Sequence, residues 1–142
     1  MSSSLLRLSQ LDRFGGFAPL PIRIFVGVFL IYMSQDNIFS SARMTEFEGF
    51  LAAHEFPAPA IAAPLSVYAQ FICGGLLILG ALTRWAALVV MINFVVALVG
   101  VHLALPLRTW LEPCAMLAVA TALFIGGPGR ISIDAALARM RA

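Results

Sequence analysis

The sequence contains no lysine, and charged residues of both signs make up only 11% of its 142 residues. A soluble domain carries about 25% charged residues, whereas 61% of the residues here are hydrophobic. The net charge is only +2 and no basic run with interleaved aromatics is present, so nothing in the sequence is suited to binding nucleic acid. The composition therefore excludes a soluble domain and a nucleic-acid-binding protein, and it predicts an integral membrane protein.

Cysteine and histidine are also scarce, with two residues of each type. Cys73 and Cys114 both fall in apolar stretches. Their predicted depths differ by roughly 10 Å, more than the separation of about 7 Å that a disulfide allows between Cα atoms. His54 and His102 belong to no CxxCH, HExxH or Cys/His cluster. We therefore expect no disulfide framework, no metal site and no haem.

What the chain has in abundance is long apolar segments. Four of them are of the length that crosses a bilayer as a helix, at about residues 20–38, 61–82, 85–105 and 110–125. No small-x-small cleavage site follows the first segment cleanly, so we expect it to be a retained span rather than a signal peptide. The prediction is an all-α fold, an integral membrane four-helix bundle, with residues 1–142 forming a single domain.

Short helices lying at the membrane surface are expected outside the spans. The Thr45-x-x-Glu48 spacing is that of a capping box and predicts a helix start in the first long loop. A second short amphipathic helix is expected after the glycine-proline break at 126–129. An amphipathic pattern at residues 5–12 favours a third, although a frayed terminus fits equally well.

Arginines set the expected orientation. With four spans, the two termini and the turn between spans two and three share one side of the membrane. That side carries six arginines (Arg7, Arg13, Arg84, Arg130, Arg139 and Arg141), against Arg43 and Arg108 on the other. The positive-inside rule therefore predicts that both termini are cytoplasmic. Arg23, near the start of span one, is expected to snorkel to the headgroups.

The second span has a face of small and polar residues at helical spacing. Its members recur every three or four positions: Ser66, Ala69, Gln70, Cys73, Gly74, Leu77 and Ala81. Small residues allow membrane helices to approach closely, and a buried amide needs a partner across the interface. We therefore expect this face to lie in the bundle, with Gln70 near its centre.

The predicted topology sorts the other polar residues by depth. Asp36, His102 and Glu112 fall near the outer ends of three different spans, and we predict them as candidate catalytic residues. Candidate ligand-binding residues are the amides Gln70 and Asn93 near mid-bilayer, and Gln35 and Tyr32 on the polar tip of span one. The amides equally suit interhelical hydrogen bonds, and the acids equally suit snorkelling to water.

Four stretches resemble the DoxX family over about residues 20–135. They are Gln70–Arg84, Ile22–Gly27, the loop ending Phe56–Pro59, and Glu112 with the tail Gly127–Asp134. The resemblance implies a small four-helix protein of the bacterial inner membrane. Members are grouped with the quinone-reducing thiosulfate oxidoreductase subunit DoxD and with a methylamine-utilisation membrane protein. Others associate with thiol-redox partners, and some distant relatives act as assembly chaperones or cargo receptors.

The chain departs from the family pattern at two places. Gln70 stands where the family has a glutamate, and Gln35, Asp36 and Asn37 stand where the family has a basic residue. A proton relay at the family's glutamate would therefore be lost here, or moved to Glu112.

Three functions remain open from the sequence. The first is a quinone- or thiol-linked redox subunit, an oxidoreductase only together with a partner, with quinone as the expected cofactor. The second is a non-catalytic structural or assembly subunit that binds a membrane partner. The third, a small-solute transporter, fits less well because broken-helix repeats are absent. Membrane lipid and other membrane or redox subunits are the expected partners, and a homo-oligomer is left open.

Overall fold

The computed structural model describes residues 9–141. Four of its helices are long and apolar enough to cross a membrane: α2 (Pro19–Phe39), α4 (Pro59–Leu79), α5 (Thr83–Gly100, continued by a 3-10 turn to Ala104) and α6 (Leu111–Gly126). No strand occurs in the described part of the chain. The all-α, four-span class is therefore confirmed. The main difference from prediction is span three, whose α-helix ends at Gly100 and passes into η2 (His102–Ala104).

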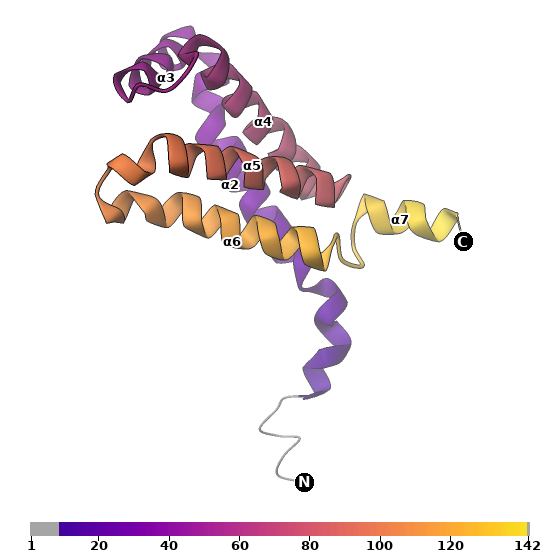
Figure 1. The fold of residues 1–142 in the computed structure, drawn as a ribbon. Helices are drawn as coiled ribbons and strands as arrows, with labels where there is room; N and C mark the ends of the chain where they lie inside the picture. The colour runs from indigo at the N-terminus through magenta and orange to yellow at the C-terminus, as the bar shows by residue number, and fades with distance from the viewer. Residues whose placement is uncertain (1–8, 142) are drawn as a thin grey trace.

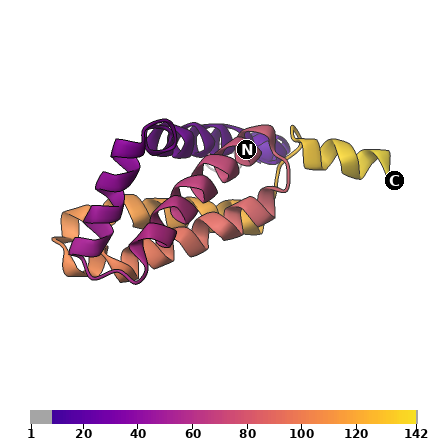
Figure 2. The ribbon, with the colours of Figure 1, turned by 90° about the horizontal axis from the view of Figure 1, so that it is seen from above.

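Short helices connect and flank the spans (Figure 1). α3 (Ser41–Ala53) lies between α2 and α4, η3 (Leu107–Trp110) precedes α6, and α7 (Ile133–Met140) forms the tail. η1 (Ser9–Phe17) precedes α2, so the predicted helix at residues 5–12 lies largely outside the described residues. Seen from above, α3 crosses the bundle at one end and α7 projects from the other (Figure 2).

The two ends of the bundle are formed by different elements. We call the end with α3, the start of α4 and the α5–α6 connection the loop end. We call the opposite end the tail end; it contains the start of α2, the α4–α5 turn and α7. α2 packs mainly on α4, and α5 packs mainly on α6. One apolar core joins the four spans, including Leu30, Leu77, Val90 and Leu123.

A close contact between helices is made by two glycines, Gly27 on α2 and Gly74 on α4. A Cβ atom added to Gly74 would lie 2.8 Å from the carbonyl oxygen of Gly27, and one added to Gly27 would lie 2.6 Å from that of Gly74. Each position therefore has room for hydrogen only. The expected small-residue face of span two does lie in the bundle, and Gly27 is its counterpart on α2.

α3 begins earlier than the capping box predicted. The Ser40 side chain accepts the Arg43 backbone N–H, and the helix starts at Ser41. Thr45 instead lies inside the helix, where its hydroxyl donates to the Ser41 carbonyl oxygen. The predicted Thr45-x-x-Glu48 start is therefore wrong, because the serine five residues earlier already caps the first turn.

Arg23 is buried beneath the tail of the chain. Its side chain is 1% exposed, and its Nη2 donates to the Ile131 carbonyl oxygen at 2.7 Å. Arg23 is covered because the tail folds back across the start of α2, so its expected contact with the headgroups stays a prediction. A backbone hydrogen bond of 2.7 Å from Arg130 to Gly16 ties the same tail segment to η1.

Asp134 fastens the tail to the α4–α5 turn. Its two carboxylate oxygens accept the backbone N–H groups of Leu82 and Thr83, each at 2.8 Å. These N–H groups stand at the start of α5, where they have no intrahelical partner and where the helix dipole favours an anion. Gly80 ends α4 with a φ of +66, and its carbonyl accepts the Asp134 N–H. One residue of the tail therefore caps the turn between two spans.

The glycine contact predicts that alanine destabilises the bundle more at position 74 than at position 75. Gly74→Ala should destabilise the bundle by about 1–3 kcal/mol, because its methyl group would displace the backbone of α2. A Cβ atom at Gly75 meets nothing within 4 Å, so Gly75→Ala is the matched control. Thermal unfolding in detergent, followed by circular dichroism, measures both. Equal melting temperatures for the two variants would contradict the close α2–α4 contact.

Candidate functional site

The loop end holds a partly enclosed cavity of about 610 Å³. Its wall is formed by α2, α3, α4 and α5, with single contributions from the loop after α3, from η2 and from the first turn of α6. Most of the lining is apolar, including Phe47, Phe50, Leu51 and Phe94. A cavity of this size and lining is suited to an apolar, ring-sized ligand.

Phe56 lines the cavity and packs on the end of α5. Its ring packs so closely on Gly100 that a Cβ atom there would lie 2.4 Å from the ring. Leu51 and Val101 lie in the same small apolar cluster, with Phe47 and Phe56 packed against it. The glycine near the end of α5 therefore makes room for an aromatic side chain that comes from the loop.

Gln70 reaches the cavity from the middle of α4. Its Nε2 donates to Ser66 Oγ, one turn earlier, at 3.2 Å. Within the described residues its Oε1 has no hydrogen-bond partner, and its second N–H is also free. The amide is held by its own helix and keeps donor and acceptor capacity for a ligand.

Asn93 lines the cavity from the middle of α5. Its side chain is half-buried, and no other described side chain or backbone group hydrogen-bonds to it. Ser34, by contrast, is satisfied on α2, because its hydroxyl donates to the Leu30 carbonyl oxygen at 2.6 Å. The carboxamides of Gln70 and Asn93, from two neighbouring helices, thus keep hydrogen-bonding capacity at the cavity wall, which Asn37 of α2 also lines.

His102 and Glu112 contribute the titratable groups. His102 Nδ1 lies 2.9 Å from the Ala97 carbonyl oxygen. A carbonyl can only accept, so Nδ1 carries a hydrogen and Nε2 is the nitrogen left to accept or bind a proton. Glu112, in the first turn of α6, is exposed and also borders the cavity. Both line the cavity at the α5–α6 connection, and we call this part of the lining the cavity mouth.

Three predicted residues lie outside the cavity. Tyr32 is 67% exposed, Asp36 is exposed and Gln35 is half-buried, and none of the three lines the cavity wall. They stand on α2 beside the stripe that faces inward, which carries Gly27, Leu30, Ser34 and Asn37. The structure thus brings together Gln70, Asn93, His102 and Glu112, and it leaves the polar tip of span one apart.

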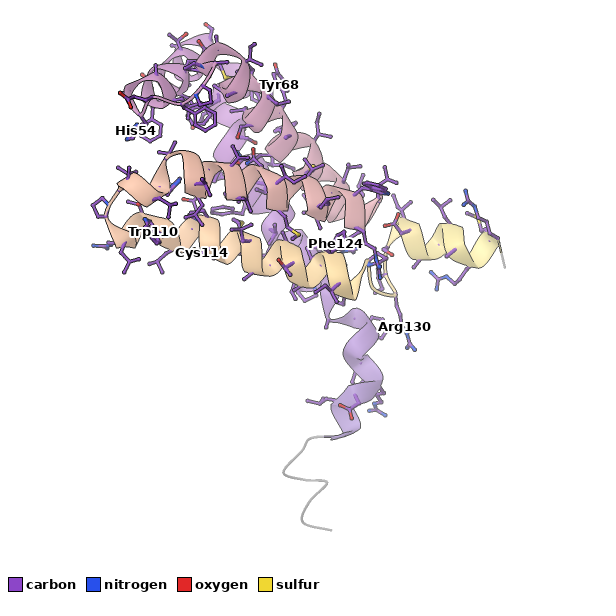
Figure 3. The ribbon with its side chains drawn as sticks, in the orientation of Figure 1. His54, Tyr68, Trp110, Cys114, Phe124 and Arg130 are labelled. Atoms are coloured by element: carbon purple, nitrogen blue, oxygen red, sulfur yellow. The ribbon has the colours of Figure 1, made fainter. Side chains whose placement is uncertain are left out.

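The cysteines and His54 are also placed away from one another. Cys73 is buried in the core, whereas Cys114 is exposed on α6. Figure 3 shows Cys114 and Trp110 near the start of α6, with His54 at the end of α3 and Arg130 at the opposite end of the bundle. Residues 9–141 bring together no three His, Cys, Asp or Glu side chains that could hold a metal ion.

The aromatic wall was the part of the site that sequence reasoning missed. The sequence does place Phe47, Phe50 and Leu51 on one face of a helix. That signal identifies an apolar face, but it does not say whether the face covers a cavity or enters the membrane.

The chain matches a protein-family model. No curated protein and no solved structure matches the chain. The model of the DoxX family matches residues 18–103, which include α2 to α5 and therefore most of the cavity wall. The chain belongs to the DoxX family.

Proposed function

We propose that this chain is the quinone-binding membrane subunit of a redox complex in the bacterial cytoplasmic membrane. The observation that carries the proposal is the cavity at the loop end, where Gln70 and Asn93 meet an apolar and aromatic wall. A quinone has a flat apolar ring and two carbonyl oxygens, and an amide N–H is a suitable donor to such an oxygen. Both carboxamides keep free N–H groups for that purpose.

The residues at the mouth complement this arrangement. A bound quinone supplies chemistry in which two electrons and two protons are taken up together. Amides cannot carry protons, so Gln70 and Asn93 orient the ligand. His102, through Nε2, and Glu112, through its carboxylate, are the groups that exchange protons with water at the cavity mouth.

The electrons come from a partner in this proposal. The described residues contain no metal-binding cluster, and the sequence has no cofactor motif. The cavity lining includes no cysteine, which favours a quinone over a thiol as the redox ligand. The alternative function is a structural or assembly subunit, in which the same polar groups contact helices of a membrane partner.

Amide variants test the binding site. Gln70→Leu and Asn93→Leu should each weaken binding of a short-chain ubiquinone analogue by about fivefold to tenfold, the loss expected for one hydrogen bond. Gln35→Leu is the matched control, because Gln35 is an amide on α2 that does not itself line the cavity. Binding is measured by quenching of tryptophan fluorescence in nanodiscs.

Glu112→Gln separates binding from proton exchange. It should leave the affinity for the analogue within about twofold, since the side chain keeps its size and lies at the cavity mouth. It should slow quinone-dependent electron transfer by the assembled complex. Equal affinities for the two leucine variants and the Gln35→Leu control would contradict the quinone site. Loss of partner yield with Glu112→Ala, but not with Glu112→Gln, would support the assembly function instead.

The orientation in the membrane forms part of the proposal. Among the described residues the tail end carries Arg13, Arg23, Arg84, Arg130, Arg139 and Arg141, whereas the loop end carries Arg43 and Arg108. The positive-inside rule then directs the tail end to the cytoplasm and the cavity to the outer side. A reporter fused after Ala142 should be active in the cytoplasm, and one inserted near Ala52 should be active outside. The opposite pattern would overturn this orientation.

A further inference from the structure

A buried arginine at the tail end is left with unused hydrogen-bond donors. Arg23 Nη2 is bonded to the Ile131 carbonyl oxygen, but Nε and Nη1 have no partner among the described residues. Within the same part of the chain, only Arg43 and Glu46 form an ion pair within 4 Å. A buried, incompletely paired guanidinium is costly unless an anion compensates it.

The nearby acid does not meet this need. Asp134 acts on Arg23 electrostatically, but its carboxylate is not within 4 Å of the guanidinium. Both of its oxygens are already bonded to the start of α5. The tail end therefore retains an excess of positive charge around Arg23.

Arg23 forms part of the wall of a recess of about 550 Å³ between α2, α4 and the tail. Two further arginines, Arg130 and Arg139, line the same recess. Arg130 is held in place by η1, since its backbone N–H donates to Gly16 and its guanidinium lies 5.8 Å from the centre of the Phe17 ring. Three arginines from α2, the α6–α7 loop and α7 thus line one recess.

We propose that this recess binds a phosphate group, and that its source is the headgroup of an anionic phospholipid. Phosphate offers several acceptor oxygens and a negative charge, which suit a recess lined by three arginines. The recess lies at the ends of the spans, where headgroups are found. Its rim carries exposed apolar side chains, among them Phe17, Leu79 and Ile131. These suit the acyl chains that accompany a lipid phosphate but not a free ion.

Lipid retention tests this proposal. The protein is purified with a mixture of phosphatidylglycerol and phosphatidylcholine of equal chain length, and the retained lipids are measured by native mass spectrometry. The unaltered protein should retain phosphatidylglycerol preferentially. Arg130→Gln and Arg139→Gln should each weaken that retention by about fivefold, the contribution of one arginine near an anionic lipid. Both residues are exposed, so these variants avoid the folding defect expected for changes at Arg23.

Arg108→Gln is the matched control, because Arg108 is an exposed arginine at the loop end. An added excess of inorganic phosphate distinguishes the two sources of the ligand. Failure of phosphate to displace the lipid supports the headgroup. Displacement of the lipid by phosphate, if it is lost in the Arg130→Gln and Arg139→Gln variants, would show that the recess binds free phosphate from water and would overturn the headgroup as its source. Retention of both lipids to the same extent, or equal retention by Arg108→Gln and the two tail variants, would overturn the proposal.

Discussion

The architecture depends on the contact between Gly27 and Gly74, where the backbones of α2 and α4 approach too closely for any side chain. Lipid tails are as apolar as the side chains of a membrane helix, so such helices associate through close packing rather than through hydrophobic burial. This contact closes the bundle on its tail side. Beyond it, toward the loop end, α2 lines the cavity with Met33, Ser34 and Asn37, and α4 does so with residues that begin at Ala62 and end at Gln70. The cavity thus begins where the glycine contact stops.

The two ends of the bundle handle polar groups in opposite ways. At the tail end, Asp134 satisfies the start of α5. Among the buried side chains of residues 9–141, Arg23 and the Thr83 hydroxyl keep polar atoms without a hydrogen-bond partner. At the loop end, the amides of Gln70 and Asn93 keep hydrogen-bonding capacity inside a largely apolar wall. Lipid offers no partners for such groups, which is why both places are proposed as ligand sites: the loop end for a neutral carbonyl and the tail end for an anion.

The spans and four polar residues of the cavity lining could be predicted from the sequence, because apolar length and helical spacing are local properties. They gave four helices, the inward face of α4, and the residues Gln70, Asn93, His102 and Glu112. Arg23 could not be placed, because its partner Ile131 is 108 residues away in the chain. Tyr32, Gln35 and Asp36 do share a face of α2, but the contact at Gly27 turns a different stripe inward. The spacing of Arg23, Gly27, Leu30 and Ser34 carried that signal.

The central claim is that the loop-end cavity holds a quinone, and photoaffinity labelling tests it most directly. An azido-quinone analogue is activated by light on the purified protein in nanodiscs, and the labelled peptides are identified by mass spectrometry. The account predicts label in α4 near Gln70 and in α5 near Asn93, and loss of that label when excess unmodified analogue is present. Label confined to exposed positions such as Phe124 or Ile125 of α6, or label that the unmodified analogue does not displace, would contradict it.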